Sequence, residues 1–121
     1  MITEDYVSFE TAKLLKEKGF DEYTLAYYDE TGIFEYDPDF LPNGLLCPTF
    51  CSAPTLGKTM KWLEAEHGIF ITVRRGIGGN GFVYTPYIFD KDSNEHKQHT
   101  GYDSRAEAEE AAIRYCVEKL I

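Results

Sequence analysis

The chain has 121 residues, of which 43% are hydrophobic and 15% aromatic. This is enough apolar material to bury one core without metal ions or disulfides, so we expect a single domain over residues 1–121. The 12 Lys and Arg residues against 21 Asp and Glu residues give a formal net charge of −9. Because affinity for a phosphate backbone comes mostly from clustered basic side chains, this charge disfavours a protein that binds duplex nucleic acid.

Cysteine use and hydropathy indicate the expected compartment. The three cysteines, Cys47, Cys51 and Cys116, form an odd number, and no secretory signal follows Met1. No apolar run approaches the roughly 20 residues needed to span a bilayer. We therefore predict a soluble, cytoplasmic protein with no membrane contact.

A helix and a hairpin are the first expected elements. Ser8 as N-cap and Gly19 as C-terminal stop predict a helix over residues 9–18. Aromatic-rich runs at residues 24–28 and 33–36 then flank four residues whose composition is typical of a hairpin turn. The sequence therefore predicts a β-hairpin directly after the first helix.

The middle of the chain repeats this order after a long loop. Residues 37–54 contain four of the five prolines, so regular structure is not expected there. A second helix is predicted over residues 55–67, with Gly68 as its C-terminal stop. Strand-like runs at residues 69–74 and 82–90, joined by the glycine-rich segment 76–81, predict a second hairpin.

The last part of the chain is expected to be a polar loop followed by a helix. Residues 91–101 are polar, and Ser104 with Glu107 fits a capping box that opens an amphipathic helix reaching Leu120. The whole order is helix, hairpin, loop, helix, hairpin, helix. It predicts an α+β fold, with an antiparallel sheet from the two hairpins and three helices packed mainly on one face.

Three stretches of the sequence carry a family resemblance: residues 4–10 with 13–22, residues 53–55 with 60–63, and residues 102–103 with 107–121. In order and spacing they resemble a family of short uncharacterised proteins carried by phages, prophages and other mobile elements of gut bacteria. The resemblance implies a phage-type accessory protein acting in a bacterial host cell, and such proteins often block host defence. It implies no reaction, ligand or functional residue.

The first hairpin is the leading candidate for a binding surface. Tyr27 and Tyr28 cannot both face inward on an extended strand, and outward tyrosines are favoured at interfaces. We hypothesise a non-enzymatic protein that binds and inhibits a host protein through an acidic, Tyr-rich surface of Tyr27, Tyr28, Glu35, Tyr36 and Asp37. Two alternatives for these tyrosines are a homo-oligomeric contact and coverage by the loop that follows.

The glycine-rich segment suggests a second hypothesis, a sponge that sequesters an anionic, nucleotide-like ligand. Residues 76–81 match G-x-G-x-x-G, but a strand follows instead of a helix, which favours a hairpin turn over a phosphate site. A ligand would be bound by aromatic stacking and an arginine clamp. The candidate residues are Trp62, Arg74, Arg75, Gly78, Gly79 and Tyr84.

A small zinc- or cysteine-dependent enzyme is the third hypothesis. Cys47, Cys51, His96 and His99 are residue types found in tetrahedral zinc sites, but both pairs lie in predicted loops and nothing in the sequence brings them together. A cysteine nucleophile would need a lowered thiol pKa and a positioned base. Packed cysteines and solvated histidines are the favoured interpretation, and we expect no cofactor.

Overall fold

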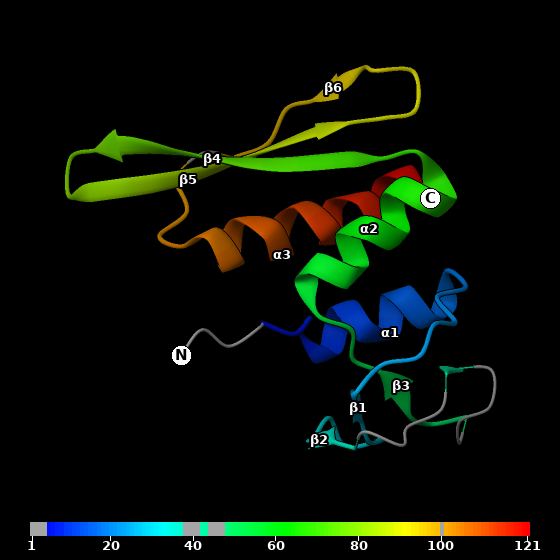
Figure 1. Cartoon of the computed structure of the whole chain (residues 1–121). Helices are drawn as coiled ribbons and strands as arrows, with labels where there is room; N and C mark the ends of the chain where they lie inside the picture. The colour runs from blue at the N-terminus through cyan, green and yellow to red at the C-terminus, as the bar shows by residue number, and fades with distance from the viewer. Residues whose placement is uncertain (1–4, 38–41, 44–47, 100) are drawn as a thin grey trace. The chain divides into compact units, whose positions relative to one another are not determined.

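A computed structural model of the chain describes residues 5–37, 42–43, 48–99 and 101–121. These residues form helices and antiparallel strands, which confirms the predicted α+β class. The chain divides into two compact units, one that ends at Thr55 and one that begins at Leu56 (Figure 1). The single domain expected over the whole chain stays a prediction.

The first unit combines one helix with a small antiparallel sheet. Helix α1 (Phe9–Glu17) begins at the predicted N-cap, where Ser8 Oγ accepts a hydrogen bond from the Thr11 backbone N–H at 3.3 Å. The strands lie in the order β2 (Phe34–Tyr36), β1 (Ala26–Tyr28) and β3 (Cys51–Ser52). Strand β3 lies inside the segment predicted as loop, because two residues are too short a run for a recognisable alternation.

The second unit places two helices on one face of another three-stranded sheet (Figure 1). Val73, Pro86 and Ile88 of this sheet are buried. The last helix was predicted to reach Leu120, but the α-helix ends at Tyr115 and the chain continues as a π-helical turn. The elements in chain order are α2 (Leu56–His67), β4 (Phe70–Gly78), β5 (Gly81–Phe89), β6 (Glu95–His96), α3 (Arg105–Tyr115) and η2 (Cys116–Leu120).

The two predicted hairpins belong to separate sheets, whereas one sheet was expected. The reason is local, because each hairpin pairs with a two-residue strand from its own unit. Strand β3 pairs with β1, and β6 pairs with β5. The helices are divided accordingly, with α1 in the first unit and α2 and α3 in the second.

The second hairpin is longer than the sequence predicted. Strands β4 and β5 pair over nine residues each, and the glycine-rich segment is mostly part of this ladder. Only Gly79 and Asn80 lie between the last paired residues, Gly78 and Gly81. Glycine carries no strand signal in the sequence, which is why the prediction ended the first strand too early.

The helix ends follow the sequence signals. Gly19 and Gly68 adopt left-handed φ angles of 91° and 69° after α1 and α2, as expected of C-terminal stops. Ser104 Oγ accepts from the Glu107 N–H at 3.2 Å, and Glu107 Oε2 accepts from the Asp103 N–H at 3.2 Å. Within the described parts of the chain, no helix has the length and apolar composition needed to cross a membrane.

Candidate functional site

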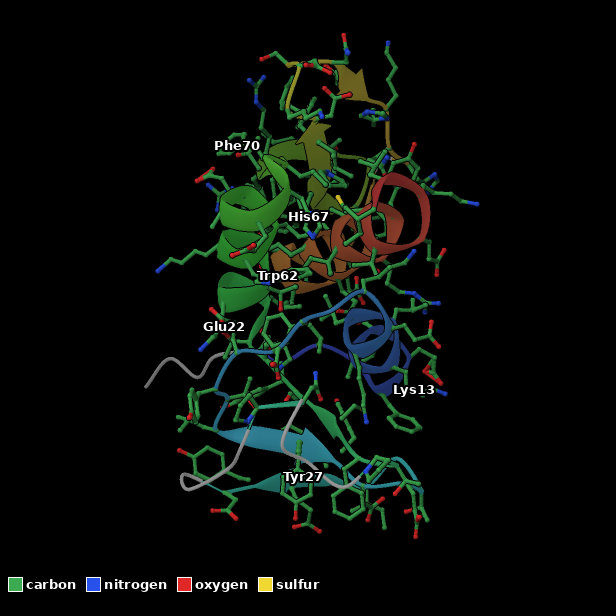
Figure 2. All side chains as sticks on the ribbon, turned by 90° about the vertical axis from the view of Figure 1, so that its right-hand side faces the viewer. Lys13, Glu22, Tyr27, Trp62, His67 and Phe70 are labelled. Atoms are coloured by element: carbon green, nitrogen blue, oxygen red, sulfur yellow. The ribbon has the colours of Figure 1, made fainter. Side chains whose placement is uncertain are left out.

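The two neighbouring tyrosines of β1 point to opposite faces of the first sheet, as strand alternation requires. Tyr28 Oη donates to the Val7 carbonyl at 2.6 Å, and its ring centroid lies 5.4 Å from that of Phe9 on α1. Tyr27 is stacked on Phe50 with centroids 5.5 Å apart, on the side of β1 away from α1 (Figure 2). Tyr28 therefore packs the unit instead of offering a binding surface, and Tyr27 is half-buried.

Acidic and apolar side chains are exposed together around β2. Glu35 and Asp37 are exposed, and the side chain of Tyr36 is 59% exposed. Leu25 and Ile33 are 48% and 56% exposed at the ends of the two strands. Together with Glu30 of the connecting turn, these residues form what we call the acidic hairpin surface: Leu25, Glu30, Ile33, Glu35, Tyr36 and Asp37.

Sequence reasoning missed the apolar part of this surface. Tyr27 is paired with Glu35, so positions two residues away from either one share their face. Leu25 and Ile33 occupy such positions. Strand alternation predicts both residues on this face, but the predicted surface included only tyrosines and acidic residues.

After Lys18, the charged residues of the first unit are all acidic. Between Lys18 and Lys58 the sequence has seven Asp and Glu residues and neither Lys nor Arg. Lys13 and Lys16 lie on α1, where Lys16 Nζ donates to the Pro48 carbonyl at 2.6 Å. The first hairpin therefore carries negative charge with no basic residue of its own.

The turn between β1 and β2 is held by side-chain bonds. Asp29 Oδ1 accepts from the Thr31 hydroxyl at 2.6 Å, the Thr31 N–H at 2.8 Å and the Ile33 N–H at 3.1 Å. These bonds, the Thr31 hydroxyl foremost, lower the pKa of Asp29. Gly32 has a φ of 85°, and a Cβ there would lie 2.8 Å from the Phe9 ring. The turn is thus fixed closely against α1.

The two arginines predicted to clamp an anion point to opposite faces of β4. The guanidinium of Arg74 lies 4.9 Å from the Tyr87 ring centroid, and that of Arg75 lies 4.1 Å from the Phe82 centroid. Adjacent residues of a strand alternate in direction. The pair is therefore not arranged to clamp one phosphate together.

Of the other predicted ligand residues, only Tyr84 is paired with one of the two arginines. Trp62 is buried on α2, with its ring edge-on to His67 at 5.0 Å (Figure 2). Gly78 is the last paired residue of β4 and Gly79 lies in the turn that follows, which confirms the hairpin-turn interpretation. Tyr84 is the cross-strand partner of Arg75, and its backbone is also bonded to Tyr102.

The end of the β4–β5 hairpin is basic and apolar. Residues 70–89 contain two arginines and no Asp or Glu. Near the turn, Ile77 is 87% exposed and Phe82 is 56% exposed. We call Arg74, Arg75, Ile77 and Phe82 the basic arm.

The candidate zinc and cysteine residues show no catalytic arrangement in the described part of the chain. Cys47 lies outside the described residues. Cys51 is buried in β3, and this burial raises its pKa, which opposes thiolate formation. His96 Nε2 lies 3.0 Å from Asp90 Oδ2, and His99 is exposed. Among the described residues, no three His, Cys, Asp or Glu side chains are grouped to hold a metal ion.

Comparison with known proteins adds no assignment. No protein-family model, curated protein or solved structure matches the chain. The function is therefore inferred from the surfaces of the two hairpins.

Proposed function

We propose that this chain is a non-enzymatic accessory protein that binds and inhibits a host protein through the acidic hairpin surface. The observation that supports it is the exposure of Leu25 and Ile33 on the face of the hairpin that carries Glu35 and Asp37. Apolar area combined with one sign of charge favours a partner with a complementary patch. The partner would present basic residues around an apolar centre.

The local structure of the hairpin favours binding without rearrangement. Tyr28 anchors β1 to the Val7 carbonyl, and Asp29 closes the turn with three hydrogen bonds. A surface held in one conformation loses little entropy when it binds. Tyr36 points to the other face of the edge strand β2, where it adds exposed contact area with few rotatable bonds.

The resemblance to phage and prophage proteins supports the inhibitory part of the proposal. Accessory proteins of that origin often act by blocking host enzymes or defence proteins. A small protein can do this by covering a functional surface of its target, with no chemistry of its own. The target is therefore expected in the bacterial host cell.

The test is capture of host proteins by the tagged full chain, followed by an affinity measurement with the protein that is retained. Glu30→Lys/Glu35→Lys reverses two exposed charges of the acidic hairpin surface, and the matched control Glu10→Lys/Glu17→Lys makes the same charge change on α1. We expect the first variant to raise Kd at least tenfold, since about 1.4 kcal/mol is a factor of ten and like charges placed against each other cost several kcal/mol. The control should stay close to the original Kd.

A second variant tests the apolar contact. Tyr36→Ala is expected to raise Kd roughly 5- to 30-fold, the effect of losing about 1–2 kcal/mol at an aromatic contact. Equal effects of the hairpin and α1 variants, or retention that neither hairpin variant changes, would contradict the proposal.

A further inference from the structure

The basic arm has no role in the proposed function, although its tip has the composition of a contact surface. Ile77 and Phe82 are cross-strand partners, so their exposed side chains share one face of the hairpin. Arg75 is two residues from Ile77 and stacks over Phe82, which places its charge on the same face. The tip therefore combines an apolar pair with a positive charge.

The acidic hairpin surface has the same construction with the opposite charge. Leu25 and Ile33 are exposed on the face that carries Glu35. The first hairpin contains no basic residue, and the second contains no acidic residue between Phe70 and Phe89. The two surfaces are therefore complementary in charge and alike in apolar content.

Both surfaces include the outermost strand of a sheet. The sheet orders β2-β1-β3 and β4-β5-β6 place β2 and β4 at an edge. An edge strand can extend its pairing to another chain. Backbone pairing could thus add to the side-chain contacts when two copies meet.

We propose that the basic arm of one copy docks on the acidic hairpin surface of a second copy, so that the chain associates head to tail. The contact is heterologous, because each copy contributes a different surface. Such contacts close into a ring or continue as a chain of copies. The inference shares the acidic hairpin surface with the proposed function, so a second copy and the host protein compete for it.

The test uses the full chain and measures its mass in solution by light scattering, over a wide concentration range and at low and high salt. The arm variant is Arg74→Glu/Arg75→Glu, and the surface variant is Glu30→Lys/Glu35→Lys. Each alone is expected to remain monomeric, with association weakened at least tenfold by like charges facing each other. Mixed in equal amounts, they should associate again, because the unchanged arm of one variant meets the unchanged surface of the other, and the two reversed patches are also opposite in charge.

Matched controls keep the test specific. Lys91→Glu/Lys97→Glu reverses two exposed positive charges of the second unit outside the arm, and it is the control for the arm variant. Glu10→Lys/Glu17→Lys reverses two exposed negative charges on α1, and it is the control for the surface variant. Both controls should associate as the original chain does. Far-UV circular dichroism and Trp62 fluorescence verify that each variant is folded.

Three outcomes would overturn the inference: a chain that stays monomeric at low salt and high concentration, an arm variant that still associates, or a mixture that remains monomeric. None of them affects the proposed function, which depends on capture of a host protein by the acidic hairpin surface. The arm variant keeps that surface, so its capture of host protein tests the proposed function separately.

Discussion

The two hairpins hold their exposed surfaces in different ways. The β1–β2 hairpin has three residue pairs, and it is positioned by side chains, with Tyr28 bonded to Val7 and packed on Phe9. The β4–β5 hairpin has nine pairs, and its backbone ladder carries Ile77 and Phe82 to an exposed end. A short hairpin thus needs specific side-chain anchors, whereas a long one can present a surface through its ladder alone.

The largest expected effect is on the free energy of unfolding, and it should differ between the two ends of the β4–β5 hairpin. Ile88 is fully buried and Ile77 is largely exposed. Ile88→Ala should lower the free energy of unfolding by about 2–5 kcal/mol, while Ile77→Ala should change it by less than about 0.5 kcal/mol. Urea unfolding followed by Trp62 fluorescence measures both, since Trp62 is the only tryptophan and lies in the same unit. A comparable loss for Ile77→Ala would show that the arm tip is packed rather than exposed.

The next largest effect on the free energy of unfolding is expected when the glycine of one hairpin turn is replaced, and not when that of the other is. Gly32 has a left-handed φ of 85°, and a Cβ there would meet the Phe9 ring, whereas a Cβ on Gly79 has no atom within 4 Å. Gly32→Ala should therefore lower the free energy of unfolding by about 2 kcal/mol, because the left-handed conformation alone costs about 1–2 kcal/mol. Gly79→Ala should change it by less than about 1 kcal/mol.

The same glycine variant also tests the predicted single domain. If residues 1–121 unfold as one domain, Gly32→Ala shifts the transition seen by far-UV circular dichroism and the one seen by Trp62 fluorescence equally. We expect this outcome. A shift in circular dichroism with unchanged Trp62 fluorescence would show that the two units unfold separately.

The smallest effect concerns two turns with the same bonding pattern. Asp90 begins the turn between β5 and β6, and its Oδ1 accepts from the backbone N–H groups of Asp92 and Asn94 at 2.9 and 3.0 Å. The hydrogen bond from His96 is the main cause that lowers the pKa of Asp90. The turn at Asp29 is bonded in the same way, and its pKa is lowered as well.

A lowered pKa in the folded state makes stability depend on pH. Both carboxylates contribute stability that is present above the ordinary value of 3.8 and is lost as the pH falls through their lower folded values. Asp29→Asn and Asp90→Asn should each weaken the acid dependence of the free energy of unfolding, measured by urea titrations at several acidic pH values. An unchanged acid dependence in the double variant would contradict this account.

The binding surface was only partly predictable from the sequence. Glu35, Tyr36 and Asp37 are exposed as expected, but Tyr28 turns inward, because its hydroxyl finds a buried carbonyl acceptor twenty-one residues away. Strand alternation predicts that Tyr27 and Tyr28 face opposite sides of the sheet. It does not predict which of the two sides α1 covers. The opposite directions of Arg74 and Arg75 follow from the same alternation, once both are placed in one strand.

The sequence by itself determined the α+β class, the helix caps and the presence of two hairpins, since these depend on residues within a few positions of one another. Ser8, Gly19, Gly68 and Ser104 all act where their spacing predicted. Only the tertiary structure decided that β3 and β6 complete two separate sheets, and which hairpin faces stay exposed. Strand partners and covered faces depend on residues far apart in the chain, and no local pattern encodes those contacts.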